Sequence, residues 1–172
     1  PTWNVGGKWN IDQENFMKEN KTISRLALRV SYGLTAKMNE EAINANSIYK
    51  SGIVNRHSLD DRESKFNIQH LENRDLTWEK MYELNIGAEL GLFENRISTT
   101  LDVYQRNTFD LIDLVRTSGV GGQYYKYANF GDMRTQGIEL GIHTKNILTE
   151  DFKWTTSLTV SAMNQKITRL LN

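Results

Sequence analysis

The chain has 172 residues, with 21 Lys and Arg against 21 Asp and Glu, a formal net charge of zero and no Cys. The length suffices for a domain with a real core. The lack of a basic excess argues against a nucleic-acid partner, and the lack of Cys excludes a disulfide framework and a thiolate metal site. No apolar run is long enough for a transmembrane helix, and no charged-then-apolar start indicates a signal peptide.

The N-terminal residues predict two strands joined by a short turn. Apolar and polar residues alternate over 3–11, which is the pattern of a strand with one apolar face. Asp12 is placed to cap a short helical turn that ends near Met17. A second alternating segment over 24–36 predicts the next strand.

Residues 37–73 lose this periodicity and are rich in Asn and Asp. We expect a long irregular loop here. Unstructured loops of this length are uncommon in compact domains and are usually functional.

The longest alternating segment is an expected hairpin over residues 78–114. Its two strands flank the polar turn 93–96, and two alternating runs joined by a tight polar turn are typical of an antiparallel hairpin. Each strand is about twice the length of an ordinary globular one.

The C-terminal part predicts two more strands after a second long loop. Residues 116–122 lead through a Tyr-rich segment to a strand that begins near Gly131 and alternates around Ile138. A turn over 145–151 joins it to a last strand over 152–162. The expected fold is therefore all-β, an antiparallel meander of about six long strands.

The connections alternate in length. Short turns are expected at 12–23, 93–96 and 145–151, and long loops at 37–73 and 114–127. Short turns at one end and long loops at the other are typical of outer-membrane barrels, whose long loops are extracellular. This rule places Asp61 outside the cell and Asn95 in the periplasm. Aromatic residues also gather toward strand ends, as in an interfacial girdle: Trp78, Tyr82, Phe93, Phe109, Phe152 and Trp154.

A soluble β-sandwich or small barrel, acting as an adhesion or binding module, is the alternative, and the mean hydropathy of −0.57 is compatible with it. Membrane barrels also give low values, because their apolar residues stand singly between polar ones. Strand length, the alternating loop lengths and the polar face favour the membrane barrel. That face needs water at Arg25 and Arg29, and elsewhere carries small uncharged residues rather than Lys and Glu: Gly87, Gly91, Ser98, Thr100, Thr155, Ser157, Thr159 and Ser161.

Two segments carry short motifs: residues 75–80 followed by Leu84-Asn85-Ile86-Gly87, and residues 129–140, which contain asparagine-x-glycine followed by glycine-isoleucine-glutamate. The first resembles the opening strand of a late hairpin, and the second a descending strand, in the SusC/RagA-like family of TonB-dependent outer-membrane transporters. The turn 91–96, the run 101–104 and the strand end 31–35 are similar as well. Each motif alone is weak, but their order and spacing are specific.

The resemblance implies that residues 1–172 form part of a transmembrane barrel of about 22 strands, within its C-terminal half and without plug or signal peptide. It implies a bacterial outer-membrane location, import of glycans or peptides, a SusD-like lipoprotein lid, and energy from TonB acting on a part outside this chain. Outer-membrane lipid would surround the barrel. Neither an enzyme activity nor a cofactor is expected.

Few residues offer a chemical site. His57, His70 and His143 are scattered, so no metal site is expected, and the acidic residues Asp60, Asp61 and Glu63 lack the spacing of a calcium loop. Ser118 lies in a Gly-rich segment that lacks the nucleophile-elbow pattern.

The ligand-binding candidates are Tyr124, Tyr125 and Tyr127. At an extracellular barrel mouth their rings could stack on sugars or pack against a peptide. The simpler interpretation, which we favour, is that they belong to the aromatic girdle or pack the loop. The substrate itself is not encoded in any pattern of this chain.

Overall fold

The computed structural model describes residues 2–38, 48–55, 62–70, 72–120 and 124–170. Almost all of them lie in strands: β1 (Trp3–Asn10), β2 (Ile23–Lys37), β3 (Ile48–Asn55), β4 (Arg62–His70), β5 (Glu79–Leu92), β6 (Ile97–Arg116), β7 (Tyr125–Leu148) and β8 (Lys153–Leu170). Two single turns of 3-10 helix, η1 (Ile11–Gln13) and η2 (Asn15–Met17), follow β1. Neither is long and apolar enough to cross a bilayer, and the described residues contain no other helix.

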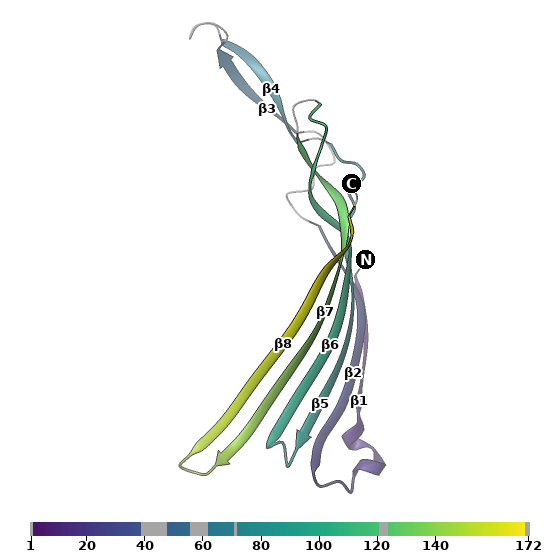
Figure 1. Cartoon of the computed structure of the whole chain (residues 1–172), viewed down its shortest axis with the longest axis vertical. Helices are drawn as coiled ribbons and strands as arrows, with labels where there is room; N and C mark the ends of the chain where they lie inside the picture. Colours follow the sequence, from purple (N-terminus) through teal and green to yellow (C-terminus); the bar gives the residue numbers. More distant parts are fainter. Residues whose placement is uncertain (1, 39–47, 56–61, 71, 121–123, 171–172) are drawn as a thin grey trace. The chain divides into compact units, whose positions relative to one another are not determined.

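Six of the strands form one sheet in the order β1-β2-β5-β6-β7-β8 (Figure 1). Within this sheet each strand lies beside the next one along the chain, so the sheet is a meander. β1 pairs antiparallel with β2, from Trp3 opposite Leu34 to Asn10 opposite Ala27. The strands β5 to β8 have 14, 20, 24 and 18 residues, well beyond the usual length. The predicted all-β meander of about six long strands is confirmed.

The prediction of an irregular loop over 37–73 is wrong. The segment contains a second sheet, the antiparallel hairpin β3–β4, in which Ser51 pairs with Phe66 and Ile53 with Ser64. Apolar residues are scattered along both strands without a sustained period of two, as in Lys50-Ser51-Gly52-Ile53-Val54, so apolar alternation could not reveal the hairpin. Backbone pairing alone defines these strands.

Two predicted strand boundaries also move. β7 begins at Tyr125 instead of near Gly131, and β8 continues to Leu170 instead of ending at Ala162. Beyond Ala162 its own face continues with the polar residues Asn164, Lys166 and Thr168, while Met163 and Ile167 fall on the opposite face, so the alternation ends although the strand continues. Ladder hydrogen bonds do not require a change of side-chain polarity.

The chain divides into two compact units. The first comprises Pro1–Thr35, Met81–Thr108 and Met133–Thr168, and the second comprises Ala36–Lys80, Phe109–Asp132 and Arg169–Asn172. The long strands β6 and β7 contribute to both.

The sheet of the first unit has one apolar and one charged face. Leu84, Val103 and Ile138 line the same shallow hollow on the apolar side, whereas Asp102, adjacent to Val103, bonds to Arg29 on the other side. Because successive side chains of a strand point to opposite faces, this agrees with the predicted separation of Leu101 from Asp102.

This sheet has almost no interior of its own. Ala27, 1% exposed, and Tyr104, 9% exposed, are the buried apolar residues of the described chain, and β8 is exposed along its whole length. Large apolar side chains on every strand of the sheet are more than a third exposed, among them Val5, Val30, Ile86, Val103, Ile138 and Leu158. A sheet with such a surface needs an apolar solvent or a partner on that side.

Candidate functional site

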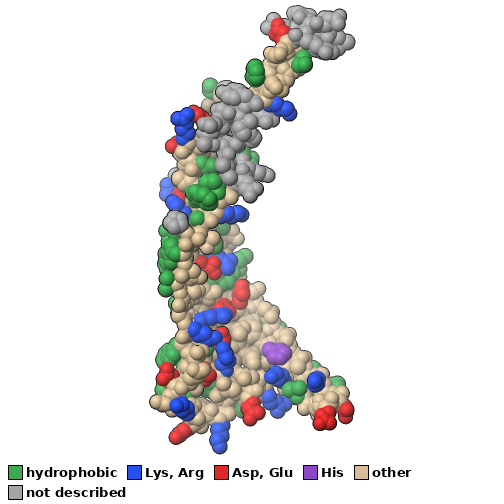
Figure 2. All heavy atoms as spheres, turned by 180° about the vertical axis from the view of Figure 1, so that it is seen from behind, with side chains coloured by type: hydrophobic (Ala, Val, Ile, Leu, Met, Phe, Trp, Pro, Cys, Tyr) green, Lys and Arg blue, Asp and Glu red, His purple; other side chains and the backbone are tan. Residues whose placement is uncertain are grey.

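A network of ion pairs crosses the polar face of the first unit. The Glu89 carboxylate of β5 accepts from Lys8 Nζ of β1 at 2.9 Å and from Arg25 Nη2 of β2 at 2.9 Å, and its side chain is only 19% exposed. Figure 2 shows Lys and Arg side chains gathered with Asp and Glu side chains over the sheet. One carboxylate thus joins three strands through two cations.

Arg29 extends this network to β6. Its Nη2 donates to both carboxylate oxygens of Asp102, at 2.7 and 2.6 Å, while Nη1 lies 3.8 Å from Glu89. Gly87 lies between these groups, since a Cβ added there would be 2.6 Å from Asp102 Oδ1. The missing side chain allows the ion pair to lie flat on the sheet.

These residues border a hollow of about 580 Å³ on the polar face. Gly6 and Ser31, which pair with each other, form its small-residue floor, and Lys8, Asn85 and Glu89 contribute to its wall. The network contains three cations and two carboxylates, so the part of the face around this hollow carries one more cation than carboxylates. It is suited to water, to polar solutes, or to a charged polypeptide surface.

A second group on this face lies around Tyr104. The Arg106 guanidinium packs 4.5 Å from the centre of the Tyr104 ring and donates from Nε to Glu83 at 2.8 Å. The ring covers Gly137 of β7, where an added Cβ would lie 2.8 Å from Tyr104 Cε1. This covering explains why Tyr104 is the buried aromatic residue of the sheet.

In the second unit, hydrogen bonds connect the two motifs that carry the sequence resemblance. The Asn129 side chain accepts from Thr77 N at 2.8 Å and donates to Thr77 O at 2.9 Å and to Asp110 O at 2.6 Å. We call these three residues the Asn129 clamp. Asp110 itself has φ +59° in the interior of β6, a backbone irregularity of the kind found at bulges.

The motif residues next to the clamp bind the same part of β6. Glu79 accepts from Ile112 N at 2.8 Å, and Lys80 Nζ lies 2.9 Å from Asp110 Oδ2. The Asp110 amide donates to Asp132 at 3.2 Å. The motifs therefore hold the irregular segment of β6 in place, which is a structural role.

The three candidate tyrosines lie at the start of β7 in the second unit. Tyr124 and Tyr125 are 62% and 58% exposed, and Tyr127 is half-buried. The Thr117 backbone amide donates to Tyr124 O, and the Asn73 side-chain amide donates from Nδ2 to Tyr127 O, which holds this segment in place. Tyr125 and Tyr127 share a strand face, and Tyr124 precedes the strand.

The other candidates do not assemble. His57, Asp60 and Asp61 lie outside the described residues, as does the side chain of His70, while His143 contacts Ser157 Oγ at 2.9 Å. Within the described ranges, no group of three His, Asp or Glu side chains could hold a metal ion.

The ion-pair network itself was missed at the sequence level. The alternation of side chains along the strands placed Arg25, Arg29, Glu89 and Asp102 on the polar face, but it did not predict their contacts. The order of strands in the expected meander could have predicted them, since opposite charges on the same face of adjacent strands tend to pair.

A wide, antiparallel sheet with an apolar outer face and a charged, glycine-containing inner face is the wall of a large membrane barrel. The model of the TonB-dependent receptor-like β-barrel family matches residues 1–168. The chain belongs to this family.

Relatives and solved structures agree. The chain is 31% identical over 165 residues to TonB-dependent receptor P3 of Formosa agariphila, and 30% identical over 168 residues to TonB-dependent receptor SusC of Bacteroides thetaiotaomicron. Each alignment covers 94% of this chain and 16% of the relative.

The RagAB peptide importer in its closed-closed state superimposes on this chain with a TM-score of 0.86 at 29% sequence identity, and the match covers 99% of this chain and 18% of the importer chain. The open-open state superimposes with a TM-score of 0.79 at 30% identity, and this match covers 98% of this chain and 18% of the importer chain. The chain therefore spans less than a fifth of the proteins it resembles.

Proposed function

We propose that residues 1–172 are part of the barrel wall of a TonB-dependent importer in the bacterial outer membrane. The supporting observation is the division of the sheet into an uncovered apolar face and a face crossed by the Lys8–Glu89–Arg25 pairs. An apolar exterior fits lipid, and a hydrated, charged interior fits a lumen. The chain supplies one sector of the wall.

In this proposal the parent protein imports glycans or peptides. Relatedness to SusC and to the RagAB peptide importer supports this class and also a SusD-like lipoprotein as the outer partner. TonB acts on a part of the parent protein outside residues 1–172. The exposed Tyr124 and Tyr125 rings offer an aromatic surface for cargo.

The soluble-module alternative is not supported by the sheet. A β-sandwich buries one face of each sheet against the other, whereas in the first unit both Val30 and Val103 on the apolar face are nearly half exposed.

The test is uptake by cells with and without the parent gene. Labelled oligopeptides and labelled oligosaccharides are supplied separately, with and without a protonophore that removes the energy supply of TonB. We expect energy-dependent uptake of one of the two classes to disappear with the gene. Unchanged uptake of both classes would refute the assignment of cargo.

The contribution of the tyrosines is tested by Tyr124→Ala and Tyr125→Ala in the parent protein. A stacking role predicts weaker cargo binding with an unchanged amount of folded protein, because aromatic stacking contributes about 1 kcal/mol per ring. Phe16→Ala, which removes another exposed ring, is the matched control. Binding equal to that of the control would leave the tyrosines with a packing role.

A further inference from the structure

The apolar face of the first unit carries a groove that ends in a row of polar side chains. The groove has a volume of about 510 Å³ and runs over β5 to β8. Its lining includes the apolar residues Leu84, Ile86, Val103, Ile138 and Ala162 of this face. At one end it is bounded by Gln105 and Gln136, whose side chains are hydrogen-bonded at 2.7 Å, and by Asn164.

Two cations lie one step beyond this boundary on the same face. Arg134 is two residues from Gln136 along β7, about 7 Å away, and its Nε donates to Asn107 Oδ1 at 2.9 Å. Lys166 is two residues from Asn164 on β8. His143 of β7 contacts Ser157 of β8, and continuing this antiparallel alignment along the two strands brings Lys166 near Arg134.

Neither cation is neutralised within the described part of the chain. Arg134 is bound to a neutral amide, Lys166 has no carboxylate partner there, and both side chains are exposed. In the ion-pair network on the opposite face, by contrast, Lys8, Arg25 and Arg29 all contact carboxylates. The positive charge on the apolar face therefore remains available to an anion.

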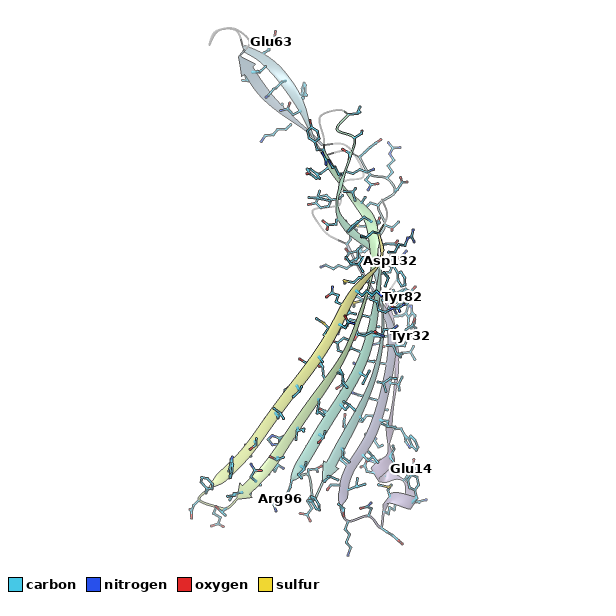
Figure 3. All side chains as sticks on the ribbon, viewed as in Figure 1. Glu14, Tyr32, Glu63, Tyr82, Arg96 and Asp132 are labelled. Carbon is cyan, nitrogen blue, oxygen red and sulfur yellow. The ribbon has the colours of Figure 1, made fainter. Side chains whose placement is uncertain are left out.

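Aromatic residues on the same face show at which depth these cations lie. The rings of Trp3 and Tyr32 meet edge to face with centroids 5.6 Å apart, and Tyr32 stacks on Tyr82 at 6.4 Å (Figure 3). The bond between Glu83 and Arg106 puts Tyr82 next to Asn107, the partner of Arg134. The cations thus continue the aromatic row at the level of the lipid headgroups.

The height of the apolar band supports this placement. From Tyr82 to Leu92, β5 rises about 33 Å along the strand at about 3.3 Å per residue, which is about 25 Å of membrane height at a tilt of about 40°. This matches the apolar band of outer-membrane barrels. The groove lies inside the band, and Arg134 with Lys166 at its edge.

We propose that the groove and the two cations form a binding site for a membrane lipid with a phosphate headgroup. An acyl chain lies on Leu84, Val103 and Ile138, and the phosphate accepts hydrogen bonds from Arg134 and Lys166. This inference rests on the proposed membrane location. It adds a lipid site to the wall of the barrel, separate from cargo and lumen.

The test uses the full-length parent protein purified in a mild detergent. Phosphatidylglycerol is titrated in, and the lipids retained per protein are counted by native mass spectrometry. The double variant R134Q/K166Q should bind the lipid about tenfold to thirtyfold more weakly, since each headgroup-level cation contributes about 1 kcal/mol. The matched control K145Q/K153Q removes two charges from the same strands, at the other end, and should bind as wild type.

Filling the groove tests the acyl-chain half of the site. Ala162→Phe should weaken binding, whereas Val160→Phe, on the same strand face but outside the groove, should not. Inorganic phosphate and a neutral diacylglycerol, each added alone, should compete poorly. Equal phosphatidylglycerol binding by wild type, R134Q/K166Q and Ala162→Phe would overturn the proposal, as would an equal loss in K145Q/K153Q.

Cargo uptake is measured on the same variants. A lipid site predicts normal uptake in R134Q/K166Q in cells whose folded barrel is present at wild-type amount. If wild-type cells fail to import either cargo class but the lipid titration gives the expected differences, the proposed cargo is wrong and the lipid site stands. If import is normal and the variants bind lipid equally, only the lipid site is refuted.

Discussion

In this sheet, the residue that fits at one position depends on the side chain that lies beside it on the next strand. Tyr104 fills the space above Gly137, and Arg29 with Asp102 fills the space above Gly87. A large side chain and a glycine in adjacent strands form one packed unit, because the ring restores the cover that glycine lacks. Glycine in a strand is costly by itself, so its partner decides whether the position is tolerated.

The first prediction concerns Gly137→Val in the full-length parent protein. The new side chain would displace the buried Tyr104 ring, and overpacking of this kind typically costs about 1–3 kcal/mol. We expect a lower midpoint in urea unfolding of the detergent-solubilised barrel, followed by its shift in gel mobility on unfolding.

Gly7→Val is the matched control for this substitution. Gly7 is also a strand glycine of the first unit, but no atom lies within 4 Å of its added Cβ. Its midpoint should stay close to that of the wild type. If Gly137→Val unfolds no earlier than Gly7→Val, the pairing of Tyr104 with Gly137 carries no stability.

At the scale of elements, the sequence predicted the strands whose two faces differ in polarity. Residues 78–114 contrast Leu101 and Val103 with Thr100 and Asp102, and this contrast alone located both strands and their faces. β3 and β4 lack it, since Gly52 and Lys65 pair on one face while Ser51 and Phe66 pair on the other. Their pairing depends on backbone hydrogen bonds, which leave little trace in composition.

The turn between β5 and β6 also has features that the sequence does not reveal. The turn 93–96 was expected from its polarity, but not that Phe93, Glu94 and Asn95 would all have positive φ, from 52° to 60°. Asn favours this conformation, whereas Phe and Glu do not. Bonds from Phe93 N to Thr22 O and from Asn95 N to Ser24 Oγ compensate for the strained backbone, and such long-range contacts are not visible in sequence.

The Asn129 clamp gives the second prediction. Asn129→Ala removes three hydrogen bonds and leaves the carbonyls of Thr77 and Asp110 without this partner. Since Thr77 is exposed and the bond to Asp110 is only partly buried, each lost hydrogen bond costs about 1 kcal/mol. We expect faster hydrogen exchange of the Asp110 and Ile112 amides in the folded parent protein, measured by mass spectrometry of peptides from β6.

A matched control for the clamp is Asn164→Ala, which makes the same chemical change on the exposed strand β8. Exchange of the β6 amides should be unaffected by it. Equal exchange in wild type and Asn129→Ala would show that Asp132 and Glu79, which bind the same amides, hold this segment without the clamp.

The first unit is an uncovered sheet with almost no core of its own. Its six-stranded sheet ends at the edge strands β1 and β8, and its apolar face is exposed from Trp3 to Leu158. Open edges and apolar faces drive aggregation in water. The fold was predictable because a barrel wall repeats one alternation many times, whereas a site depends on single contacts.

The third prediction follows from this surface. Residues 1–172 expressed alone should be insoluble in buffer and extractable with detergent, because water cannot solvate the apolar face. Centrifugation with and without detergent measures this directly. A monodisperse monomer in buffer with a cooperative thermal transition would contradict a barrel-wall origin and favour a self-contained module.

The last prediction concerns orientation in the parent barrel. The expected alternation of loop lengths holds for three connections, since short turns join β5 to β6 and β7 to β8, while β2 is followed by the β3–β4 hairpin before β5 begins. It fails for the other two, because the β6–β7 connection, residues 117–124, is shorter than the β1–β2 connection, residues 11–22. Long connections of outer-membrane barrels are extracellular and short ones periplasmic.

In intact cells, Lys65→Cys on β4 should therefore react with a membrane-impermeant maleimide, and Glu150→Cys in the β7–β8 turn should not. Glu150 is preferred to Asn95 because a cysteine at a positive φ would be strained. After the outer membrane is permeabilised both cysteines should react, which controls for their accessibility. Labelling of Glu150→Cys but not of Lys65→Cys in intact cells would invert the topology and also move the Arg134–Lys166 pair from the outer to the inner leaflet.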